Sequence, residues 1–114
     1  MIGLPSQGRI YLRRAATDMR KSFDGLSGLV RGEFGQDPLT GDLFVFMNRR
    51  RDLLKALYWD RDGFALWAKR LERGRFMLPA GADRELDRAT LALLLEGVKA
   101  RVLFRSPRWK VGAG

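Results

Sequence analysis

The chain has 114 residues, 46% of them hydrophobic and 31% charged, which predicts one folded domain rather than a disordered segment. Cysteine and histidine are both absent, which excludes disulfides, zinc sites built on these residues, and Ser–His or Cys–His nucleophilic catalysis. The net charge of +9, from 22 basic and 13 acidic residues, favours a polyanionic partner such as nucleic acid, although an arginine-rich chain can also reflect a GC-rich genome.

The first predicted elements are a strand and a helix. Residues 8–14 alternate in polarity, with Ile10 and Leu12 on one face, which predicts a strand that pairs with the rest of the sheet, with an edge position as one option. From Asp18 the apolar spacing changes to three and four, which predicts a helix with Thr17 as its N-cap and Gly35 as its stop. The expected buried stripe of this helix is Met19, Phe23, Leu26, Val30 and Phe34.

The central stretch, residues 42–79, predicts an antiparallel β-meander. It contains four short apolar runs, rich in Phe, Trp, Tyr, Leu and Val, which alternate with clusters of turn-forming or charged residues. Turns are expected at residues 48–52, 60–63 and 72–74. The four runs are Leu43–Met47, Leu53–Trp59, Phe64–Leu71 and Arg75–Leu78.

A second helix is predicted from Arg88 to Glu96, with Asp87 as its N-cap and Gly97 as its stop. Residues 101–104 can form a short extra strand, and residues 106–114 read as a basic, flexible tail. We therefore expect one α+β domain over residues 1–105, in which two helices pack on one face of an antiparallel meander sheet of four to five strands. The expected buried stripe of the second helix is Leu91, Leu94, Leu95 and Val98, widened by Leu93.

The hairpin tips give the meander one basic and one acidic end. Successive tips alternate between the ends of a sheet, so the tip at residues 49–51 shares an end with Arg73, opposite the tip with Asp60 and Asp62. We expect the basic end to contact nucleic-acid phosphates; the alternative is a solvated loop that limits aggregation. The candidate nucleic-acid-binding residues are Arg49, Arg50, Arg51, Lys69, Arg70, Arg73 and Arg75.

Both faces of the predicted strands carry apolar side chains; Phe44 and Phe46, for example, oppose Val45. Two helices on one face would leave the other face exposed. This second face is then expected to bind a partner protein, a second copy of the chain in a homo-oligomer, or nucleic-acid bases. The alternative is that the N-terminal segment and the tail fold over it.

Catalysis, a metal and a cofactor are not expected. The only carboxylates that invite a metal are Asp18, Asp24, Asp60 and Asp62, and turns or a helix start explain most of them. No glycine-rich loop carries the lysine of a phosphate-binding motif. No apolar run approaches the about 20 residues of a membrane span, and no secretory signal is recognised, so no membrane partner and a cytoplasmic location are expected.

Four stretches of the sequence form a recognisable set: TDMRKSFDGL at residues 17–26, NRRRD at residues 48–52, KRLERGRF at residues 69–76 and LLLEG at residues 93–97. In these stretches the sequence resembles the small TnpB accessory proteins of IS sixty-six type bacterial insertion sequences, whose opening motif is TDMRKxFDGL. The resemblance covers nearly the whole chain and thins after Lys99. At Ala68 and Met77 the chain departs from the bulky aromatic residues expected in relatives.

The resemblance implies a role in DNA transposition beside a separate, larger DDE-type transposase and another small transposon-encoded protein. The family is distinct from the RNA-guided nucleases that share the TnpB name, and no catalytic residues are attached to its motifs. We therefore expect a non-catalytic accessory protein for transposition of a bacterial insertion sequence, which binds transposon DNA, its transposase, or both. The alternative is a protein–protein adaptor of the transposition complex that makes no contact with DNA.

Overall fold

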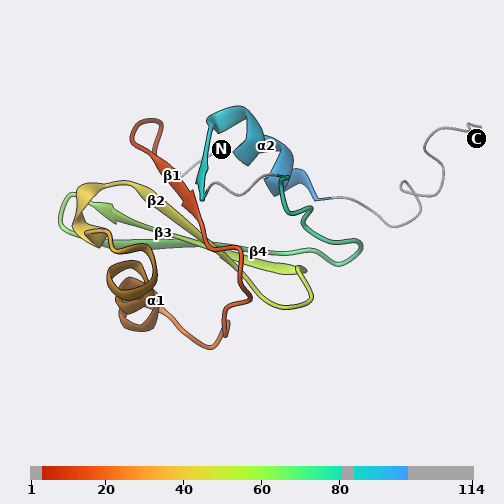
Figure 1. Cartoon of the computed structure of the whole chain (residues 1–114), viewed down its shortest axis with the longest axis horizontal. Coiled ribbons are helices and arrows are strands. Elements are labelled where there is room, and N and C mark those ends of the chain that lie inside the picture. The colour runs from red at the N-terminus through yellow and green to blue at the C-terminus, as the bar shows by residue number, and fades with distance from the viewer. Residues whose placement is uncertain (1–3, 81–83, 98–114) are drawn as a thin grey trace, which may run out of the picture.

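The sheet is built around β2 (Leu43–Met47), in which all five residues are buried. The computed structural model describes residues 4–80 and 84–97, and it orders the five strands β4–β3–β2–β1–β5 (Figure 1). Aromatic and β-branched residues make β2 a good central strand, because their side chains pack well on a pleated surface. The other strands are β1 (Ile10–Leu12), β3 (Leu53–Asp60), β4 (Gly63–Arg70) and β5 (Glu85–Leu86).

The predicted meander is confirmed for β2, β3 and β4, which pair antiparallel in sequence order. The sheet as a whole is mixed rather than antiparallel, because β1 pairs parallel with β2. The fourth predicted strand, Arg75–Leu78, is wrong: only Arg75 makes a bridge. Phe76 is 1% exposed and anchors this segment in the core, so the run serves to insert one aromatic ring rather than to extend the sheet.

β1 lies inside the sheet, between β2 and the short β5. Beyond β1 the chain stays beside β2, where the Thr17 amide donates a hydrogen bond to the Met47 carbonyl at 2.8 Å. Thr17 is therefore not a helix N-cap, and the predicted helix start at Asp18 is wrong. The helix α1 runs from Phe23 to Leu29 and continues as a π-helix over Val30–Phe34, which ends at Gly35 with φ of 64°. A positive φ explains the glycine at this stop.

The buried face of α1 was predicted in part. Leu26, Val30 and Phe34 are buried as expected, whereas Phe23 is 43% exposed. The difference follows from the later helix start, because Phe23 is the first residue of α1 rather than part of its second turn. Lys55 of β3 holds the segment before α1 on the sheet. Its Nζ donates hydrogen bonds to the carbonyls of Met19 and Lys21, at 2.8 and 2.9 Å.

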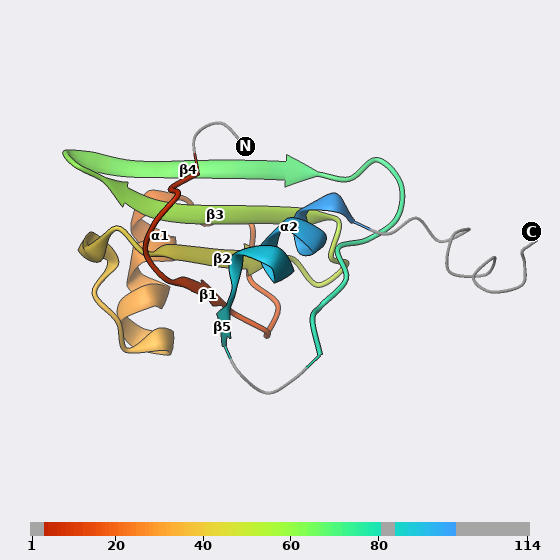
Figure 2. The same cartoon turned by 90° about the horizontal axis from the view of Figure 1, so that it is seen from above.

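The helices cover opposite faces of the sheet, so the expectation that both pack on one face is wrong (Figure 1, Figure 2). Successive strand side chains alternate between faces, and an apolar face must pack against another element. The core on the α1 face consists of Tyr11, Leu26, Val30, Phe34, Phe44, Phe46 and Leu57. The core on the α2 face consists of Ile10, Leu12, Leu43, Val45, Met47, Leu54, Ala56, Phe76, Leu86, Leu91, Leu94 and Leu95.

The second helix, α2 (Arg88–Glu96), has the predicted bounds and the predicted cap. The Asp87 side chain accepts a hydrogen bond from the Thr90 amide at 2.7 Å, and Gly97 follows the last turn. Leu93 does not widen the buried stripe, because it is 68% exposed. Val98, the predicted strand at 101–104 and the predicted tail at 106–114 lie outside the described residues. No helix in the described part of the chain has both the length and the apolar character to cross a membrane.

Adjacent leucines of α2 test how this helix packs. Leu94 is 2% exposed and Leu93 is 68% exposed. We expect Leu94→Ala to lower the free energy of unfolding by about 2–5 kcal/mol, because it opens a cavity against the sheet. Leu93→Ala should change it by less than about 0.5 kcal/mol. Urea denaturation of both variants measures the difference, and equal losses would contradict this orientation of α2.

Candidate nucleic-acid interface

The turn between β2 and β3 is organised by one asparagine. The Asn48 Oδ1 accepts hydrogen bonds from the amides of Asp52 and Leu53, at 3.1 and 3.2 Å. Its Nδ2 donates to the Asp52 Oδ1 at 2.6 Å. Asn and Asp favour turns because their short side chains satisfy nearby backbone groups. The turn is thus fixed from within, and the three residues that it presents, 49–51, are all exposed arginines.

The carboxylate of this turn has a lowered pKa. The hydrogen bond from Asn48 is the main cause, and the charges of Arg50 and Arg70 act in the same direction, so the pKa of Asp52 lies below its ordinary value of 3.8. A group whose folded-state pKa is lowered stabilises the fold at pH values above its unfolded-state pKa. This contribution of Asp52 is lost as the pH falls through its folded-state pKa.

The segment after β4 is attached to the same turn. The Leu71 amide donates to the Asp52 carbonyl and the Phe76 amide donates to the Arg51 carbonyl, both at 2.7 Å. These two bonds bring Arg73 and Arg75, both exposed, to the end of the sheet that carries residues 49–51. Figure 2 shows this segment at the opposite end from the connection between β3 and β4. A loop, rather than the predicted third hairpin, therefore assembles this end.

Six exposed arginines share this end of the sheet. The candidates predicted from the sequence thus gather at one place, with the exception of Lys69, and their role in binding stays a prediction. We call this set the basic end. It consists of Arg49, Arg50, Arg51, Arg70, Arg73 and Arg75.

Lys69 has a different position. It lies opposite Leu54 on the face that α2 covers, and its Nζ donates a hydrogen bond to the Leu95 carbonyl at 2.9 Å. A cation at the C-terminus of a helix satisfies a free carbonyl and interacts favourably with the helix dipole. Lys69 therefore holds α2 on the sheet, which is why the basic end is defined by arginines alone.

The opposite end of the sheet carries the tip between β3 and β4. Asp60 and Asp62 are exposed there, and between them lies Arg61, whose Nε is 3.8 Å from the Asp60 Oδ1. Arg61 has a φ of 57° and Arg51 a φ of 59°, so each tip places one arginine in the left-handed region. The two tips thus share one left-handed arginine, although their loops differ in length.

The four carboxylates considered for a metal do not gather into a site. Asp18 binds Arg20, with 2.8 Å between the Arg20 Nη2 and the Asp18 Oδ2. That hydrogen bond is the main cause that lowers the pKa of Asp18 to about 2. Asp24 lies in the first turn of α1. Residues 4–80 and 84–97 contain no group of three or more acidic side chains that could hold a metal ion.

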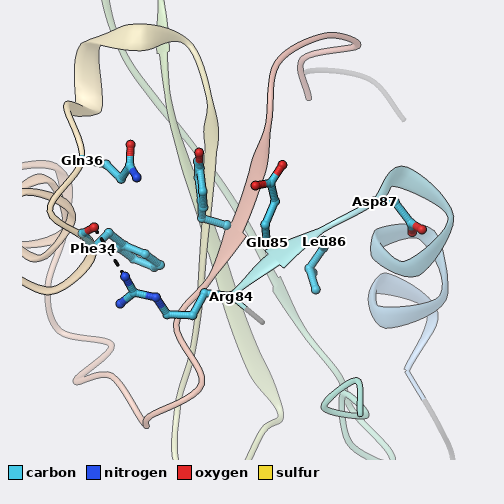
Figure 3. Close-up of a pocket in the computed structure, with 7 residues that line it drawn as sticks. Phe34, Gln36, Arg84, Glu85, Leu86 and Asp87 are labelled. Atoms are coloured by element: carbon cyan, nitrogen blue, oxygen red, sulfur yellow. Dashed lines mark hydrogen bonds between the residues drawn. The ribbon is translucent and has the colours of Figure 1, made fainter. Parts of the chain in front are cut away.

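Sequence reasoning missed a pocket of about 650 Å³ at the β5 edge (Figure 3). The Arg84 Nη1 donates to the Glu33 carbonyl at 2.8 Å, and its guanidinium lies 5.2 Å from the centre of the Phe34 ring. Arg84 thus ties β5 to the end of the π-helix. A two-residue strand such as β5 is too short to show a periodic pattern, so no signal in the sequence marks this pocket. The lining residues are Tyr11, Phe34, Gln36, Arg84, Glu85, Leu86 and Asp87.

Comparison with known proteins identifies the family. Residues 8–104 match the family described as IS66 Orf2 like protein. The chain belongs to this family. It is 38% identical over 110 residues to the uncharacterized protein y4jC of Sinorhizobium fredii (strain NBRC 101917 / NGR234), with 94% of this chain and 93% of the relative covered. It is 39% identical over 95 residues to the uncharacterized protein y4hO of the same strain, with 82% and 83% covered. No solved structure matches the chain.

Membership of the IS66 Orf2-like family confirms the resemblance found in the sequence. The family points to an accessory protein of transposition rather than to a known class of enzyme. The matched residues include both parts of the basic end, the turn at 48–52 and the segment at 70–76.

The pKa of Asp52 tests how the arginine turn is held. We expect Asn48→Ala to raise this pKa toward 3.8, because the main hydrogen bond to the ionised carboxylate is removed. The pKa of Asp87, which is lowered by hydrogen bonds from Thr90, should not change and serves as the control. An NMR titration of the carboxyl carbons measures both. An unchanged pKa for Asp52 would show that Asn48 does not organise the turn.

Proposed function

We propose that the protein assists the transposition of an insertion sequence by binding DNA through the phosphates that contact its basic end. The role is non-catalytic, and the larger transposase of the element carries out the chemistry. DNA strands are held or presented to that enzyme in a complex that this chain helps to assemble. The proposal combines the accessory role of the family with the charge distribution of the chain.

The observation that carries the proposal is the attachment of the segment 70–76 to the turn at 48–52. Two backbone hydrogen bonds, Leu71 to Asp52 and Phe76 to Arg51, join segments that are separate in sequence. Arginine suits phosphate because its planar guanidinium donates several hydrogen bonds in a fixed geometry. The Asp52 carboxylate accepts a hydrogen bond from Asn48, and its Oδ2 lies 4.0 Å from the Nε of the exposed Arg50.

Phosphate contacts alone give binding that does not depend on sequence. The basic end is formed by loops at the end of a sheet, and no described helix projects from it. The basic end therefore offers no described helix that could enter a groove of DNA and recognise its bases. We propose that the protein binds duplex DNA with little sequence preference and that the transposase supplies the specificity.

A protein adaptor is the second candidate function, and an apolar groove favours it. Met77 and Leu93 are 49% and 68% exposed. Together with Pro79 and Gly97 they line a groove of about 320 Å³ beside α2. Exposed apolar side chains that gather on one surface are typical of protein-binding sites. A transposase segment that docks there would place this protein in the complex without any contact to DNA.

Replacement of the arginines 49–51 by glutamine tests the proposal. The triple variant should bind all duplex sequences more weakly, because fewer phosphates are neutralised and fewer counterions are released. The slope of log affinity against log salt should become shallower by about 0.9 for each phosphate that is no longer neutralised. Stability should barely change, since the three side chains are exposed. Fluorescence anisotropy at several salt concentrations measures affinity and slope together.

Arg61 provides a matched control. Arg51→Gln and Arg61→Gln each remove one charge from a hairpin tip at nearly the same φ, so their effects on folding should be alike. We expect only Arg51→Gln to weaken DNA binding. If the triple variant is folded and keeps the affinity and salt slope of the original chain, the basic end is a solvated loop. The adaptor function would then be the better account.

A further inference from the structure

The strand β4 is a long and open edge of the sheet. It has eight residues, and in the described part of the chain it pairs only with β3. Figure 2 shows it along one border of the sheet. Its first five residues are half-buried, which means that both of its faces are already packed against the protein. What remains unpaired is the backbone along its outer side.

The pairing pattern shows which backbone groups face outward. The Asn48 amide donates to the Leu53 carbonyl, so Leu53, and every second residue after it, bonds toward β2. The residues between them bond toward β4. Along β4, residues that bond to β3 alternate with residues whose N–H and C=O point away from β3. The outward residues of β4 are therefore Phe64, Leu66, Ala68 and Arg70.

Most of the usual protections of an edge strand are missing from β4 in the described part of the chain, where Arg70 is the one charged outward residue. Natural edges are made short, carry proline, a bulge or charged side chains, or are covered by a helix or loop. β4 has no proline, and its eight residues pair one-to-one with β3 without a bulge. Lys69 is bonded to the Leu95 carbonyl on the α2 face. The opposite edge, β5, is only two residues long, so the lack of protection is confined to β4.

We propose that β4 pairs antiparallel with β4 of a second copy of this chain, so that one sheet continues across both subunits. The distribution of charge favours this partner. β4 runs from a tip with Asp60, Arg61 and Asp62, which is acidic by one charge, to the basic end with Arg70. Antiparallel pairing with an identical strand therefore brings the acidic tip of one subunit beside the basic end of the other, twice in each dimer.

The side chains fit the same arrangement. In the register that pairs all four outward residues, Phe64 lies opposite the partner's Arg70, and Leu66 lies opposite the partner's Ala68. Ala68 is small and exposed, so it leaves room for the partner's Leu66. The turn at 48–52 joins β2 to β3, so its residues are not among the outward residues of β4. Residues 49–51 stay accessible in the dimer, and this inference does not depend on DNA binding.

Amide hydrogen exchange of the full chain tests the proposal without any substitution. In a dimer, the amides of Phe64, Leu66, Ala68 and Arg70 should be protected as strongly as those of Ala65 and Trp67, which bond to β3. Their protection should fall on dilution, and light scattering should give twice the mass of one chain at high concentration. Rapid exchange of the four outward amides would overturn the proposal. So would protected outward amides in a chain of monomeric mass, since another segment would then cover the edge.

Ala68→Pro gives a second test. Proline removes an N–H that faces outward, so the bonds to β3 are kept. We expect this variant to have the mass of a single chain, while Ala68→Ser, which keeps the N–H, retains the mass of a dimer. A folded Ala68→Pro variant that remains dimeric would show that the copies associate through another surface. The exchange experiment decides the question if the proline variant does not fold.

Discussion

Both faces of β2 are buried, and the rest of the structure depends on this constraint. Phe44 and Phe46 point to one face, and Leu43, Val45 and Met47 point to the other. Each face therefore needs an apolar cover, and the chain supplies one helix for each. α1 packs on the aromatic side and α2 on the aliphatic side. With both faces closed, the ends and the edges of the sheet are the places where charge and open backbone can gather.

The proposed functions follow from this division of the surface. At one end, hydrogen bonds of Asn48 and the two backbone bonds between residues 51–52 and 71–76 hold exposed arginines in a fixed place. We propose that this surface binds phosphate by charge, which needs no cleft. At one edge, β4 offers a row of backbone groups to another strand. An accessory protein that joins DNA to a protein assembly requires these two kinds of contact. The two surfaces share only Arg70, which ends β4 and belongs to the basic end.

Local patterns predicted α2 and two hairpins, but not the start of α1 or the segment Arg75–Leu78. The bounds of α2 follow from Asp87 and Gly97, and the hairpins β2–β3–β4 follow from alternating apolar runs and turn residues. The basic end followed from the alternation of hairpin tips, although a loop completes it. Long-range pairing was not predictable, because no local pattern shows that β1 joins β2 in parallel or that Thr17 bonds to Met47. Lys69 resembles its arginine neighbours in the sequence, and only the position of α2 separates it from them.

We propose that DNA contacts the end of the sheet formed by residues 48–52 and 70–76. The most direct measurement is an NMR titration of the isotope-labelled chain with a short duplex, followed through the backbone amides and the arginine Nε–Hε signals. We predict that the shifts change with DNA at these two segments and stay constant at the tip of residues 60–63. Changes confined to the groove beside α2, or spread evenly over the surface, would contradict the account.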